Sequence, residues 1–240
     1  MNPFLDSAAR AAQLVASGDP QLLHIVGLSL SVSALACMIA TAFGLLIGAA
    51  VAVWRFPGRG AVLVVLNTLL ALPSVVVGLV VYLLLSRAGP LGSWGILFTP
   101  AAMVIAQAIL VTPIVAALAR QTIEDAMRNH GQQLRSLGAN RLECALIIAW
   151  DERLALLTLA LLAFGRAVSE VGAVMMVGGN IAGVTRVMTT AIALETSKGD
   201  LPLALALGLV LLAVVLLINV VIGVLREWRL MHEREAGAVT

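Results

Sequence analysis

The feature that most constrains this chain is a series of apolar runs long enough to cross a lipid bilayer. A hydrocarbon core about 30 Å thick requires roughly 20 predominantly apolar residues in a helix. Five runs of that length occur, at 25–53, 61–86, 99–119, 154–178 and 201–225. Hydrophobic residues make up 61% of the chain and charged residues only 12%, whereas about 25% of residues are charged in soluble domains. The sequence therefore predicts an all-α membrane protein with about five transmembrane helices.

The spacing of these runs predicts a single folded domain. No polar stretch approaches the roughly 50 residues that a second domain would need. We expect one transmembrane domain over 25–225, an extracytoplasmic segment over 1–24 and a cytoplasmic tail over 226–240. The net charge of +2 is small and its arginines are scattered, so the sequence predicts contact with the lipid bilayer and no nucleic-acid-binding face.

The arginines between the runs predict the orientation in the membrane, because cytoplasmic loops carry an excess of basic residues. One side of the membrane receives ten of them: Arg55, Arg59, Arg120, Arg128, Arg135, Arg141, Arg153, Arg226, Arg229 and Arg234. The opposite side receives Arg10, Arg87, Arg186 and Lys198. The N-terminus is therefore expected outside and the C-terminus inside.

The segment 120–153, between the third and fourth runs, is too long and too polar to be a simple turn. Gly138 suits the C-terminal cap of a first helix. Asn140 suits the N-cap of a second, and Glu143 lies where its carboxylate can complete a capping box. The pattern predicts a helix, a glycine turn and a second helix. We expect the second helix to place the apolar side chains of Leu142, Ala145, Leu146 and Ile148 against the ends of the membrane helices.

Charged residues occur inside only one apolar run, as Arg166 and Glu170 in the fourth. Charges in a membrane helix usually face a bundle interior, a cavity or each other. One interpretation is a structural ion pair that locks this helix or a dimer seam. The other is a translocation pathway in which Arg166 attracts an anion, and Ser169, Asn180 and Thr189 donate hydrogen bonds to it, with Glu170 tempering the attraction.

Two prolines lie inside expected membrane helices, Pro73 in the second run and Pro113 in the third. A proline removes one backbone hydrogen bond from a helix and commonly kinks it. Either the kinks serve packing alone, or Pro73 and Pro113 shape a central pathway.

Residues 132–151 resemble the EAA loop of bacterial ABC importer permeases, whose pattern is Glu-Ala-Ala, three residues, Gly, nine residues and Ile-x-Leu-Pro. Gly138 and Ile148 fall in register with this pattern. The triplet is replaced by Gln132-Gln133-Leu134, and Trp150-Asp151 stands in place of Leu-Pro.

Three further stretches strengthen this resemblance. Residues 72–92 and 165–173 are similar to molybdate and tungstate permeases, and residues 175–190 are most similar to tungstate permeases. The resemblance covers most of 25–225 and implies the type I ABC importer permease fold.

The resemblance implies a transport function without catalysis by this chain. It implies a homodimer in a bacterial or archaeal cytoplasmic membrane, two cytoplasmic ATPase subunits, and a periplasmic or lipid-anchored protein that delivers an oxyanion, with tungstate favoured. The ATPase-coupling loop would comprise Gln132, Gln133, Arg135, Gly138, Asn140, Glu143 and Ile148. ATP would be used by the partner, and we expect no cofactor or metal bound by this subunit, whose only lysine, Lys198, is not followed by the Ser or Thr of a phosphate-binding loop.

Several alternatives stay open at this stage. The anion could be molybdate or sulfate. A self-sufficient channel or secondary transporter would leave the long polar loop unexplained. An intramembrane enzyme would need converging catalytic groups, and Ser169 with Glu170 is a poor dyad because adjacent helical residues point about 100° apart.

Overall fold

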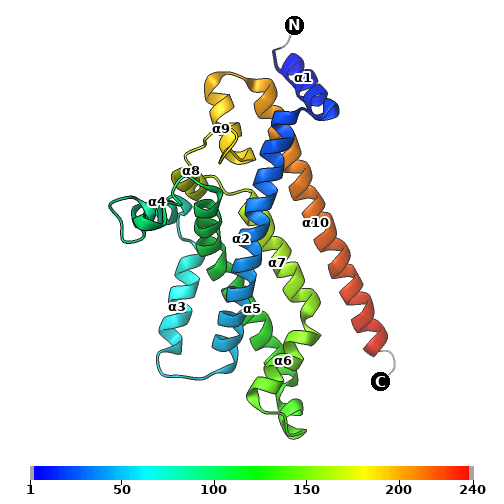
Figure 1. The fold of residues 1–240 in the computed structure, drawn as a ribbon. Helices are drawn as coiled ribbons and strands as arrows, with labels where there is room; N and C mark the ends of the chain where they lie inside the picture. Colours follow the sequence, from blue (N-terminus) through cyan, green and yellow to red (C-terminus); the bar gives the residue numbers. More distant parts are fainter. Residues whose placement is uncertain (1–2, 238–240) are drawn as a thin grey trace. The chain divides into compact units, whose positions relative to one another are not determined.

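The computed structural model describes residues 3–237, and side chains from residue 8 to residue 228. Residues 238–240 of the expected tail, and the side chains of Arg229 and Arg234, lie outside this described part. Within it the elements are helical (Figure 1) and follow in the order α1 (Pro3–Ser17), α2 (Pro20–Val53), α3 (Arg59–Leu70), α4 (Ser74–Leu85), η1 (Gly92–Trp94), α5 (Pro100–Ser136), α6 (Arg141–Asp151), α7 (Arg153–Val168), α8 (Gly172–Gly178), α9 (Met188–Lys198) and α10 (Leu201–Gly237).

Within residues 3–237, three helices are long and apolar enough to cross a membrane unaided, over Pro20–Val53, Pro100–Ser136 and Leu201–Trp228. Two further spans are possible if the bent pairs α3–α4 and α7–α8 each cross once. The structure therefore has three to five candidate membrane spans, and the sequence predicted about five. The prediction of an all-α protein with about five membrane helices is confirmed.

Two expected spans are broken rather than continuous. The run 61–86 divides before Pro73, which is the N-cap of α4 and has a φ of −63°. The run 154–178 divides at Ser169–Val171, where α7 and α8 are bent by 58°. By contrast, α5 continues past its apolar stretch to Ser136 and contains Pro113 without ending there. Neighbouring packing can compensate for the backbone bond that a proline removes from a membrane helix.

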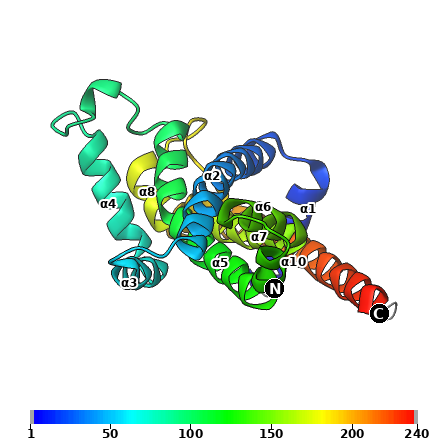
Figure 2. The ribbon, with the colours of Figure 1, turned by 90° about the horizontal axis from the view of Figure 1, so that it is seen from below.

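The chain divides into two compact units. The first comprises 1–37, 73–110 and 164–217. Its apolar core joins the start of α2, α9 and the start of α10, with Ile25, Met188 and Leu207 almost fully buried. In the same unit α4 lies beside α8 (Figures 1 and 2). A Cβ on Gly78 would lie only 2.8 Å from the Cα of Ala173, so the close approach of these two helices requires glycine.

The second unit comprises 38–72, 111–163 and 218–240. One core of this unit joins Val53 at the end of α2 and Ile123 in α5 to Ala145 and Ile148 in α6. The chain reverses after α5, and α6 packs back on α5 (Figure 1). Packing against α5 thus fixes one face of α6 and leaves the other exposed.

Candidate functional site

The turn between α5 and α6 is built by local hydrogen bonds around Gly138. The amide of Ala139 donates to the Leu134 carbonyl at 3.1 Å, and the amide of Gly138 donates to the Arg135 carbonyl at 3.0 Å. These two bonds form a Schellman motif, in which the residue directly after the helix, here Gly138, must adopt a left-handed conformation. Gly138 has a φ of +91°, so its predicted role as a helix cap is confirmed.

The start of α6 has the predicted capping box. The Asn140 side-chain oxygen accepts from the amides of Leu142 and Glu143, each at 2.9 Å. The Glu143 carboxylate in turn accepts from the Asn140 amide at 2.8 Å. Because both helix ends are satisfied internally, the turn has a defined shape even though it is exposed.

The expected orientation of α6 is wrong for two residues. Ala145 and Ile148 are buried as expected, together with Cys144, but the side chains of Leu142 and Leu146 are 60% and 64% exposed. Residues four apart share one helix face, so Trp150, which is 70% exposed, continues the same stripe. We call Leu142, Leu146 and Trp150 the outer stripe. Since α6 is apolar on both faces, the sequence pattern alone could not tell which one packs inward.

The other residues of the expected coupling loop lie in different surroundings. Gln132, Gln133 and Arg135 are exposed near the end of α5, and the Arg135 Nε donates to the Gly131 carbonyl at 2.9 Å. Ile148 is only 1% exposed and belongs to the core of the second unit. Its structural role is therefore packing, which positions the exposed residues of α6.

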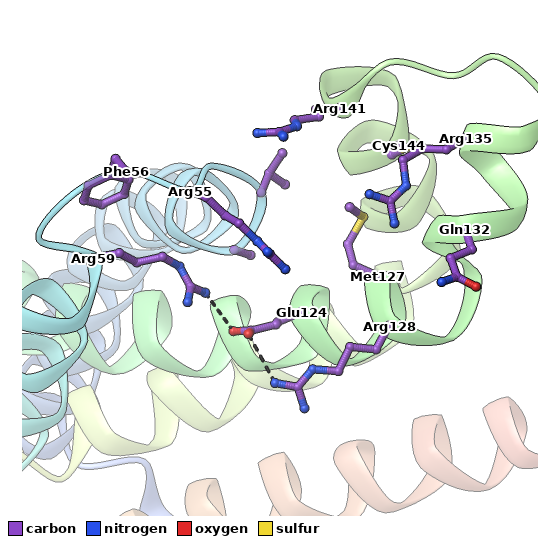
Figure 3. A pocket seen from close by; sticks show the side chains of 12 residues that line it. Arg55, Phe56, Arg59, Glu124, Met127, Arg128, Gln132, Arg135, Arg141 and Cys144 are labelled. Carbon is purple, nitrogen blue, oxygen red and sulfur yellow. Dashed lines mark hydrogen bonds and ion pairs between the residues drawn. The ribbon is translucent and has the colours of Figure 1, made fainter.

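A carboxylate bound by three arginines lies in the extension of α5 beyond its apolar stretch. Glu124 accepts from Arg120 at 2.6 Å, Arg59 at 3.1 Å and Arg128 at 3.2 Å, and two of these contacts are drawn in Figure 3. Burial raises the pKa of Glu124, but the guanidinium groups of Arg59 and Arg120 outweigh it and hold the pKa below its ordinary value. Sequence reasoning missed this cluster, although Arg120, Glu124 and Arg128 are spaced four apart and predict contact on one helix face.

The break between α7 and α8 brings the intramembrane charges together. Arg166 donates to Glu170 at 2.7 Å, and the Glu170 side chain is only 2% exposed whereas that of Arg166 is 44% exposed. The other Glu170 oxygen accepts from the Ala173 amide at 3.2 Å, at the start of α8. The Glu170 carbonyl accepts from the Thr189 hydroxyl at 2.7 Å. Glu170 therefore ties together α7, α8 and α9.

The hydroxyl and amide groups assigned to a pathway already have backbone partners. The Ser169 hydroxyl donates to the Gly165 carbonyl at 2.9 Å, and the Asn180 amide donates to the Thr190 carbonyl at 3.3 Å. Asn180 lies in the left-handed turn after α8, with a φ of +52°. Pro73 lies in the first unit, before α4, and Pro113 lies in the second, within α5. The structure thus brings Arg166, Ser169, Glu170 and Thr189 to one helix break.

Apolar helices long enough to span a membrane, together with a capped and exposed helix-turn-helix, define a multi-pass membrane protein. Residues 40–229 match the family described as binding-protein-dependent transport system inner membrane component, and the chain belongs to that family. It has the type I ABC importer permease fold and is a multi-pass protein of the cytoplasmic membrane.

Individual relatives match almost the whole chain. A tungstate uptake system permease protein TupB of Peptoclostridium acidaminophilum is 44% identical, over 93% of this chain and 99% of the relative. A probable anion ABC transporter permease protein of Haloferax volcanii is 40% identical, over 86% and 92%. TupB of Campylobacter jejuni is 35% identical, over 90% of both chains. The resemblance inferred from the motifs is confirmed.

Proposed function

We propose that this chain is the permease subunit of an ATP-driven importer for tungstate. Two of these relatives, which are tungstate uptake permeases, support tungstate as the substrate, and one of them is 44% identical over nearly the full length of both proteins. The chain would form the translocation pathway and leave ATP hydrolysis to a separate subunit. Molybdate and sulfate are the competing substrates.

The single observation that carries the coupling role is the outer stripe of α6. Leu142, Leu146 and Trp150 form an exposed apolar face on a short helix whose two ends are both capped. A hydrophobic core flanked by polar residues is the arrangement that binds another protein. We assign this face, with the exposed Gly138 turn and Gln132, to contact with a cytoplasmic ATPase subunit.

The remaining partners and the orientation extend this proposal. Two copies of the chain would form a homodimer with two ATPase subunits, and a periplasmic or lipid-anchored binding protein would deliver the anion. The proposed docking face places the α5–α6 turn in the cytoplasm. An odd number of spans then puts the N-terminus outside and the C-terminus inside, in agreement with the distribution of arginines.

The contacts favour different roles for the two residues, a structural role for Glu170 and a pathway role for Arg166. Glu170 is buried and bound to α8 and α9, which supports the structural interpretation for the carboxylate. Arg166 is partly exposed and keeps further guanidinium N–H groups for an anion, because an arginine has five such donors. An Arg166→Ala variant that still assembles but no longer transports would support the pathway role, and loss of assembly would contradict it.

The direct test is transport by the reconstituted complex. Vesicles containing this chain and its candidate ATPase would be supplied with the binding protein, and uptake of tungstate, molybdate and sulfate would be compared with and without ATP. The proposal expects uptake of tungstate that requires both the ATPase and ATP. Equal uptake by vesicles containing this chain alone would instead indicate a channel or secondary transporter.

A further inference from the structure

A cationic hollow of about 680 Å³ lies in the second unit, beside the α5–α6 turn (Figure 3). The charged residues that line it are Arg55, Arg59, Glu124, Arg128, Arg135 and Arg141. They come from the α2–α3 loop, the starts of α3 and α6, and the second half of α5. Five positive charges therefore surround one space with a single carboxylate among them.

That carboxylate cannot neutralise the hollow, because its contacts are already occupied. Glu124 is bound by Arg59 and Arg128 from within the lining, and by Arg120 from outside it. Among the described side chains no carboxylate forms an ion pair with Arg55, Arg135 or Arg141. Like charges that converge without a counter-charge repel one another, and an anion placed between them removes that repulsion.

The three arginines without carboxylate partners reach the hollow from three separate segments. Arg135 lies at the end of α5, Arg141 begins α6, and Arg55 lies in the α2–α3 loop (Figure 3). Guanidinium groups present planar, forked sets of N–H donors that match the oxygens of phosphate-like anions. Because Gly138 lies between Arg135 and Arg141 in the chain, an anion bound to both would bridge the two arms of the turn.

We propose that this hollow binds a tetrahedral oxyanion and thereby holds the α5–α6 turn. The chemistry is shared by two sources, a free oxyanion such as tungstate or inorganic phosphate, and the phosphate group of an anionic lipid. That the hollow faces the cytoplasm rests on the proposed function. The binding itself depends only on the arginines that line it.

The test uses the full chain, purified in detergent. Sodium tungstate and inorganic phosphate are titrated calorimetrically, and the thermal midpoint is measured with added phosphatidylglycerol or phosphatidylcholine. Wild type is compared with Arg55→Gln and Arg141→Gln. The control is Arg153→Gln, which removes the same charge from an exposed arginine that lies over the Trp150 ring and is not among the residues that line the hollow.

Each lining substitution is expected to weaken binding about tenfold or more, since it removes a charge-assisted hydrogen bond, while the control binds like wild type. Binding of tungstate or phosphate in detergent identifies a free oxyanion as the source. Stabilisation by phosphatidylglycerol alone identifies the lipid. A response to neither, or a response that the lining variants leave unchanged, would overturn the inference.

Two additions keep the outcome clear. Arg141→Lys retains the charge but loses the fork, so it is expected to bind more weakly than wild type and more tightly than Arg141→Gln, which guards against a variant that simply misfolds. The binding readout is also independent of uptake. Absent tungstate uptake with intact anion binding would contradict the proposed function alone, and normal uptake without anion binding would contradict this inference alone.

Discussion

Gly48 offers a quantitative test of how α2 and α5 pack within the second unit. A methyl group added at Gly48 would lie 2.7 Å from the carbonyl oxygen of Ala116, 2.9 Å from the amide nitrogen of Arg120 and 3.0 Å from the Cβ of Ala119. Two of these neighbours are backbone atoms, so the strain cannot be relieved by turning a side chain. Overpacking of this kind costs about 1–3 kcal/mol, and the better helix propensity of alanine returns at most about 1 kcal/mol.

The matched control is Gly27→Ala in the same helix, because a Cβ there would have no neighbour within 4 Å. Both variants would be purified in the same detergent and their thermal midpoints compared. One kcal/mol corresponds to about 2–4 °C for a chain of this size. We expect Gly48→Ala to unfold several degrees below Gly27→Ala. Equal midpoints, or a higher midpoint for Gly48→Ala, would refute the close packing inferred at this position.

Three further predictions concern the α5–α6 region. Asn140→Ala removes the acceptor of two amides and is expected to cost about 1 kcal/mol, whereas Asn140→Asp keeps an acceptor and should retain the wild-type thermal midpoint. Glu124 has a lowered pKa, so the stability it contributes is present above its ordinary value of 4.5 and is lost as the pH falls through the lower folded value. Thermal midpoints of wild type should therefore fall more steeply than those of Glu124→Gln between about pH 5 and pH 3, and parallel curves would exclude this contribution. Trp150→Ala removes an exposed ring, and among the described residues the one ring contact that Trp150 makes is with the Arg153 guanidinium. The variant should therefore keep nearly the wild-type thermal midpoint but bind the ATPase more weakly in a pull-down.

Local chemistry made parts of the site predictable from sequence. Gly138, Asn140 and Glu143 act through hydrogen bonds to residues within five positions of them, so their spacing alone specifies the turn. The apolar runs likewise predict membrane helices by length and composition.

Other features depend on contacts between distant segments and gave no local signal. The bend at Ser169–Val171 is held partly by the contact of Glu170 with Thr189 in α9, which is 19 positions away in the sequence. The inner face of α6 is chosen by packing against Ile123. Arg55 and Arg141 are 86 positions apart in the sequence and line the same hollow only in the folded unit.

The central claim, that the α5–α6 turn docks an ATPase, is tested most directly by co-purification of this chain with its candidate ATPase. Wild type would be compared with Gly138→Glu and with Gly58→Glu. Both glycines have a positive φ, +91° and +87°, and in neither case would a Cβ meet another atom within 4 Å, so the two variants carry equal charge and similar backbone strain. The account predicts a complex with wild type and Gly58→Glu that is lost with Gly138→Glu. A complex that survives Gly138→Glu, or that does not form even with wild type, would contradict it.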